Sequence, residues 1–179
     1  TSMHGLFTIY EIPEWISYLL SIFTIIVITN SFNLIDGING LAGSIAIIVL
    51  VSFGIWFYFM NDFSLVLIIV GIVGSILAFL KFNYTPAQIF MGDTGSLLIG
   101  FVVSIISIRF IEANSQLPAD HSLKFMSSIA ICTSILVYPL FDTSRIFTLR
   151  ILQGRSPFSP DKNHIHHLIL RLKCSHTKA

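Results

Sequence analysis

The sequence predicts an all-α integral membrane protein with about five transmembrane helices. Hydrophobic residues make up 54% of the 179 residues and charged residues only 11%, against roughly 25% charged residues in a typical soluble domain. Apolar stretches recur near the length of about 20 residues that crosses a bilayer core. We expect residues 1–179 to form one membrane domain, without a soluble domain or an internal repeat. The expected spans are residues 16–28, 41–60, 63–82, 97–111 and 125–141.

The shorter spans reach membrane length by including flanking small polar residues, which pack well between membrane helices. Trp15 stands just before the first span, where its amphipathic ring suits the membrane interface. The chain opens on residues that read as a connector and ends in the polar "RLKCSHTKA". We therefore expect a piece of a longer chain, truncated at both ends.

Charge predicts the orientation of these spans. The connections after the first, third and fifth spans lie on one side of the membrane, and those after the second and fourth lie on the other. The second side has Arg109 and Lys124 beside three acidic residues, Asp62, Glu112 and Asp120. The first side is strongly basic, with Lys81, Arg145, Arg150, Arg155, Lys162, Arg171 and Lys173. The positive-inside rule places that side, including an expected loop over residues 142–179, in the cytoplasm.

The first polar motif is "NSFNLIDGING", residues 30–40, which directly follows an apolar run. Asn30, Asn33, Asp36 and Asn39 are spaced by three, so they form a slanting polar stripe on a helix. The glycines that follow let the backbone turn or approach a ligand closely. The alternative is an ordinary helix cap and turn at the membrane surface.

The second motif, "PAQIFMGDTGS", covers residues 86–96 and falls on the same side of the membrane. It places Asp93 at a helix start just before the fourth span, where backbone N–H groups favour phosphate. The Asp93 carboxylate is also a hard oxygen ligand suited to Mg²⁺. The alternative is an Asp or Thr N-cap with no ligand. The motif is neither a Walker loop nor a dinucleotide fingerprint.

The third motif, "FDTSRIFTLRILQGRSPFSPDKNHIHH", covers residues 141–167 and is again cytoplasmic. Arginine forks and imidazole groups can hold a diphosphate and uracil-type acceptors, and Phe158 can stack on a base. Two alternatives remain open, a basic segment that contacts anionic lipid and a histidine-rich zinc site. The candidate binding residues are Arg155, His164, His166 and His167.

Together the three motifs resemble the signature loops of the polyprenyl-phosphate N-acetylhexosamine-1-phosphate transferases. The HIHH form resembles the bacterial undecaprenyl-phosphate GlcNAc-1-phosphate transferase branch. The resemblance covers essentially the whole chain. It implies a multi-pass enzyme of the bacterial inner (plasma) membrane whose active site faces the cytoplasm. Such an enzyme transfers N-acetylhexosamine-1-phosphate, here GlcNAc-1-phosphate, from a UDP-sugar to undecaprenyl phosphate and releases UMP. This transfer starts the synthesis of a cell-surface polysaccharide.

The resemblance also implies partners and residue roles. The partners are a UDP-N-acetylhexosamine, undecaprenyl phosphate and membrane lipid, with no nucleic acid, and a homodimer stays open. Asp93 and Asn33 are the implied ligands of Mg²⁺, with Mn²⁺ as an alternative ion, and Asp36 joins Asp93 as a catalytic acid. The implied substrate-binding residues are Asn30, Asn33, Arg155, His164, His166 and His167.

This sequence departs from the family pattern in two places. Asn39 stands where many relatives have a second Asp, and the sequence has no adjacent Asp-Asp pair, which the family has on an earlier cytoplasmic loop. We therefore expect the fragment alone to be inactive. Three alternatives stay open: a phospho-MurNAc-pentapeptide transferase-like enzyme, a catalytically silent membrane scaffold, and a segment of a transporter or channel.

Overall fold

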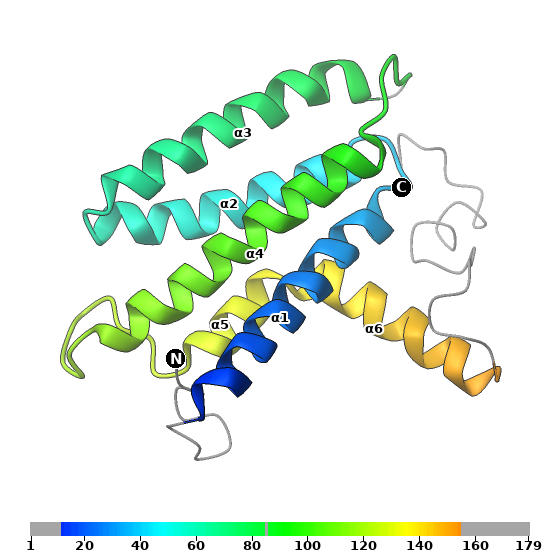
Figure 1. Ribbon diagram of the computed structural model, residues 1–179. Coiled ribbons are helices and arrows are strands. Elements are labelled where there is room, and N and C mark those ends of the chain that lie inside the picture. Colours follow the sequence, from blue (N-terminus) through cyan, green and yellow to red (C-terminus); the bar gives the residue numbers. More distant parts are fainter. Residues whose placement is uncertain (1–11, 85, 155–179) are drawn as a thin grey trace.

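The computed structural model describes residues 12–84 and 86–154, and these residues form helices without any strand (Figure 1). This confirms the predicted all-α class. The helices are α1 (Glu14–Ile35), α2 (Leu41–Phe59), α3 (Phe63–Asn83), α4 (Gly92–Gln116), α5 (Ser128–Ile135) and α6 (Val137–Leu152).

Four of these helices, α1 to α4, are long and apolar enough to cross a membrane. The pair α5 and α6 passes the same test jointly and is bent by 80° at its break, so it counts as a fifth span if the two helices are taken as one. The prediction of about five spans is thus confirmed for the part of the chain that the structure describes.

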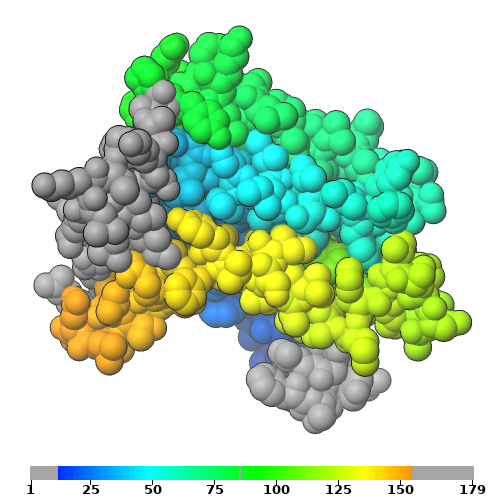
Figure 2. Space-filling view, turned by 180° about the vertical axis from the view of Figure 1, so that it is seen from behind, coloured from blue at the N-terminus to red at the C-terminus, as the bar shows by residue number. Residues whose placement is uncertain are grey.

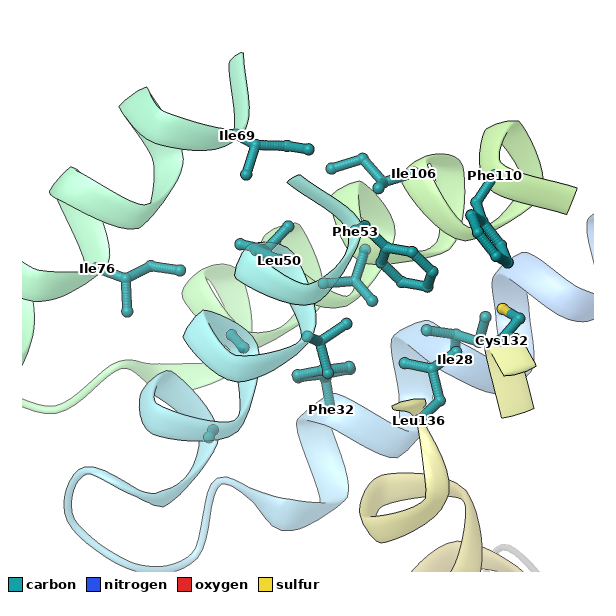
Figure 3. Packing of buried hydrophobic residues seen from close by; sticks show 14 of the residues in the cluster. Ile28, Phe32, Leu50, Phe53, Ile69, Ile76, Ile106, Phe110, Cys132 and Leu136 are labelled. Atoms are coloured by element: carbon teal, nitrogen blue, oxygen red, sulfur yellow. The ribbon is translucent and has the colours of Figure 1, made fainter. Parts of the chain in front are cut away.

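The helices pack around a core built mainly by α1, α2 and α4. The contact between α1 and α4 is the most extensive, α2 packs against both α3 and α4, and α6 leans on α1. Figure 3 shows Phe32 of α1, Phe53 of α2 and Phe110 of α4 converging there. The Phe53 and Phe110 rings lie 5.2 Å apart between centroids, within the range of favourable aromatic pairs.

One glycine allows the close approach of α1 and α4. A Cβ atom added at Gly100 would lie 2.7 Å from the Cα atom of Thr29 and 3.1 Å from the Cβ atom of Phe32. Membrane helices commonly use small residues to bring two backbones together in this way. Helices α1 and α4 lie side by side and run in opposite directions (Figure 1). The C-terminal end of α1 therefore meets the N-terminal end of α4.

The ends of α1 and α4 differ from the expected spans. Helix α1 continues to Ile35 rather than ending near residue 28, and α4 begins at Gly92 rather than at residue 97. The polar residues extend α1 because their side chains bond to their own helix: Asn30 Nδ2 donates to the Ile26 carbonyl at 2.8 Å. The first motif therefore starts on the last turns of a helix.

The expected fifth span, residues 125–141, is not one straight helix. Helix α5 ends at Ile135 and α6 starts at Val137, and Figure 2 shows the pair, in yellow to orange, running across one face of the molecule. Pro139 supplies the physical reason, because a proline ring clashes with the carbonyl four residues earlier, which here belongs to Ile135. Residues 142–152 of the expected cytoplasmic loop are part of α6.

The end of the bundle opposite the first two motifs is closed by a structured connection over residues 117–127. Asn114 Nδ2 donates to the Phe125 carbonyl at 2.9 Å, and the Phe125 N–H donates to Asn114 Oδ1 at 2.8 Å. Trp56 Nε1 also donates to the Leu123 carbonyl at 3.1 Å. These bonds tie the connection between α4 and α5 to the core.

Candidate functional site

Asp36 and Asp93 come together at one end of the bundle. Asp36 caps the C-terminus of α1, and Asp93 lies in the first turn of α4. Burial first, and then the nearby negative charge of Asp93, raises the pKa of Asp36 from 3.8 to about 6. Asp36 is half-buried and Asp93 is exposed, so the pair consists of one sheltered and one accessible carboxyl group.

Asn33 joins the same site through Ser96. The Ser96 hydroxyl donates to Asn33 Oδ1 at 2.8 Å, and Ser96 itself is only 1% exposed. This bond connects the last turn of α1 to the first turns of α4. The amide oxygen of Asn33 keeps a second lone pair for another donor or a cation.

A second connection runs through Asn83, which the sequence reasoning missed. The Gly40 N–H donates to Asn83 Oδ1 at 2.6 Å, and Asn83 Nδ2 donates to the Ile89 carbonyl at 2.9 Å. Gly40 has φ of 81°, a left-handed conformation that glycine adopts without strain. The available signal was a lone Asn at the end of a long apolar run.

Of the other predicted site residues, the structure describes only Asn30. Asn30 is exposed and its amide bonds back to the Ile26 carbonyl within α1. Arg155, His164, His166 and His167 lie outside the described residues.

The described part of the third motif contains an ion pair between a buried acid and a partly exposed arginine. Arg145 Nη2 lies 3.4 Å from Asp142 Oδ1, and Asp142 is 1% exposed. Arg150, in the last turn of α6, is also buried. Part of the basic charge expected to face the cytoplasm is therefore inside the protein, and Asp142 had not been anticipated as its partner.

The donor set around Asp36 suits a hard divalent cation. Within residues 12–84 and 86–154, no three His, Cys, Asp or Glu side chains gather into a metal cluster. However, Mg²⁺ in phosphate-transfer sites is commonly held by one or two carboxylates, with phosphate oxygens and water completing its shell. Asp93, Asp36 and the Asn33 amide oxygen are donors of this kind, and Asp93 is the one exposed to solvent.

Comparison with known proteins identifies the family. Residues 1–111 match the family model described as Glycosyl transferase family 4. A probable undecaprenyl-phosphate N-acetylglucosaminyl 1-phosphate transferase of Bacillus subtilis (strain 168) is 36% identical over 162 residues, which are 90% of this chain and 43% of that protein.

Two further relatives are undecaprenyl-phosphate alpha-N-acetylglucosaminyl 1-phosphate transferases of Yersinia pestis and Escherichia coli (strain K12). Each is 33% identical over 158 residues, or 86% of this chain and 41% of the relative. The chain thus spans about two-fifths of the length of these relatives. The family match covers both Asp36 and Asp93 and confirms the resemblance drawn from the motifs. The chain belongs to glycosyl transferase family 4.

Proposed function

We propose that the full-length protein transfers GlcNAc-1-phosphate from UDP-GlcNAc to undecaprenyl phosphate and releases UMP. The names of the relatives support the acceptor and the transferred group. The three motifs and their resemblance support the nucleotide donor. The observation that carries the proposal is the meeting of Asp36 and Asp93, from α1 and α4, at one end of the membrane helices.

Phosphoryl transfer depends chiefly on charge neutralisation and in-line placement of the reacting groups. Asp93 and Asn33 would hold Mg²⁺, with Mn²⁺ as an alternative, and the bound ion would neutralise charge on the diphosphate. Asp36 is the second acid, which orients the reacting groups from its half-buried position. A pKa of about 6 leaves Asp36 mostly ionised at neutral pH.

The third motif completes the proposed substrate site. We assign Arg155, His164, His166 and His167 to the uridine diphosphate end of the donor, because arginine and imidazole donors suit phosphate and uracil oxygens. The lipid phosphate would arrive from the bilayer, which the apolar helices adjoin.

We propose that this end of the bundle faces the cytoplasm of a bacterial plasma membrane. Lys81, in the last turn of α3, is exposed at the same end as the two acids. Asp62 and Asp120 lie at the other end, in the connections after α2 and α4. The positive-inside rule counts Lys and Arg, and the sequence places Lys81, Arg155, Lys162, Arg171 and Lys173 on this side against Arg109 and Lys124 on the other. This excess supports the proposed orientation.

The test is UMP release from UDP-GlcNAc in the presence of undecaprenyl phosphate. Asp93→Asn removes a charge and a hard ligand while barely changing volume, so Mg²⁺-dependent release should fall by more than about 100-fold. Asp120→Asn is the matched control, because it makes the same change at an exposed position at the opposite end and should leave the rate unchanged. A normal rate for Asp93→Asn at ordinary Mg²⁺ concentration contradicts the assignment.

A further inference from the structure

We propose that Asn83 is a positioning residue that fixes the distance between Asp36 and Asp93 by bonding to the loop that carries Asp36 and to the loop that leads into Asp93. The first loop is residues 36–40 and the second loop is residues 86–91. This inference rests on the function proposed above, since the ion held by Asp93 and the reacting groups oriented by Asp36 need a fixed separation.

The Asn83 side chain makes one hydrogen bond to each loop. Its Oδ1 accepts from the Gly40 N–H at 2.6 Å, at the end of the first loop. Its Nδ2 donates to the Ile89 carbonyl at 2.9 Å, in the second loop. Asn83 is only 4% exposed, so these bonds compete little with water and their loss would leave buried polar groups unpaired.

The two bonds close a ring around the acids together with the bond between Ser96 and Asn33. Asn33 and Gly40 flank Asp36 in the sequence, and Ile89 and Ser96 flank Asp93. Ser96 Oγ to Asn33 Oδ1 closes the ring on the helix side, and Asn83 closes it on the loop side. Each acid therefore lies between two residues of the sequence, one before it and one after it, that take part in this ring of hydrogen bonds.

Each loop is otherwise anchored to its own neighbourhood. In the second loop, the Gln88 N–H donates to the Phe82 carbonyl at 2.8 Å, at the end of α3. In the first loop, the Asp36 N–H donates to the Asn33 carbonyl at 3.4 Å. These bonds shape each loop but do not join one to the other, whereas the Asn83 amide does.

The pair needs such a constraint because two carboxylates repel each other, and the negative charge of Asp93 acts on Asp36. An asparagine suits the position because one planar group supplies both an acceptor and a donor. An ionised aspartate has the same shape but only acceptors, so it can keep the bond to Gly40 and must lose the bond to Ile89.

Asn83→Asp therefore separates positioning from simple electrostatics. An added negative charge near the acids should tighten binding of a divalent cation, whereas the loss of the link to the second loop should weaken it. We expect Mn²⁺ binding, followed by electron paramagnetic resonance in the full-length protein without substrate, to weaken by about 10–100-fold, the range for groups that orient metal ligands. Asn83→Ala should weaken Mn²⁺ binding similarly.

Tyr84→Phe is the matched control. Tyr84 neighbours Asn83, and its hydroxyl lies 3.0 Å from Ser44 Oγ on α2, so the variant removes one hydrogen bond between the end of α3 and the start of α2 while keeping both bonds of Asn83. It should keep Mn²⁺ affinity within about twofold. Amide hydrogen exchange gives a second readout: the segment 86–91 should exchange faster in Asn83→Asp but not in Tyr84→Phe.

The outcomes are distinct. Wild-type or tighter Mn²⁺ binding by Asn83→Asp, with unchanged exchange of residues 86–91, overturns the role of Asn83 and leaves the proposed function standing. Failure of the wild-type protein to bind Mn²⁺ or to release UMP overturns the proposed function itself, and this inference with it. If Asn83→Ala does not fold, the isosteric Asn83→Asp still decides the matter.

Discussion

Replacing Asp36 with Asn should stabilise the metal-free protein at pH 8 while stopping transfer. The pKa of Asp36 rises from 3.8 to about 6 in the folded protein, so the folded state binds this proton more tightly than the unfolded state does. Folding stability from this group is therefore highest below about pH 4, falls as the pH rises toward 6, and stays low above it. An asparagine side chain does not ionise in this pH range, so the variant does not lose this stability as the pH rises.

The size of the effect follows from the shift. A rise of about two pH units corresponds to about 3 kcal/mol, and because Asp36 is half-buried, solvent screening reduces this to roughly 1.5 kcal/mol. Asp93 contributes part of the shift, so Mg²⁺ should restore stability to the wild-type protein but much less to Asp36→Asn.

The assay is thermal unfolding in detergent with a chelator, at pH 4 and at pH 8. Asp36→Asn should unfold a few degrees above the wild-type protein at pH 8 and at the same temperature at pH 4. The exposed Asp120→Asn should shift neither midpoint. An Asp36→Asn protein that is no more stable than wild type at pH 8, or equally stabilised at both pH values, refutes the reasoning.

Other predictions concern packing, orientation and the extent of the active unit. Gly100→Ala should lose about 1–3 kcal/mol of stability through overpacking against α1, whereas Gly74→Ala, with open space around it, should be neutral or gain up to about 1 kcal/mol; thermal unfolding compares them. Asn114→Ala should lose about 1–3 kcal/mol without changing the Mg²⁺ requirement, which a combined melt and rate assay checks. A cysteine at Gln88 should react with a membrane-impermeant maleimide only from the cytoplasmic side, and labelling in intact cells contradicts the orientation. Residues 1–179 alone should not release UMP from UDP-GlcNAc, so a rate equal to that of the full-length protein shows that the absent Asp-Asp motif is dispensable.

Hydropathy was enough to find α2 and α3 almost to the residue. Their apolar runs begin sharply, directly after Gly40 for α2 and directly after Asp62 for α3. The ends of α1 and α4 were misplaced because hydropathy treats a polar side chain as a reason to stop. Asn30 satisfies its amide on the carbonyl of Ile26, so the helix continues through it.

The membrane side of each connection was enough to predict that Asp36 and Asp93 share one end of the bundle. The partners that hold them were not predictable in the same way. Asn83 bonds to Gly40, 43 residues away, and only the packing of α2 on α3 brings them together. Pro139 was visible in the sequence, but hydropathy alone did not show that it divides the last apolar run into α5 and α6.

The long-range pairing of α1 with α4 also bears on how the protein is made. Chains emerge from the ribosome N-terminus first, at about 5–20 residues per second, so α1 emerges before α4. The turn between α2 and α3 is short and lets these helices insert as a hairpin, whereas Gly100 can dock on Thr29 only after α4 has followed. Asp36 therefore meets Asp93 only after α4 has packed on α1, so the proposed ion site is complete only once these helices have assembled.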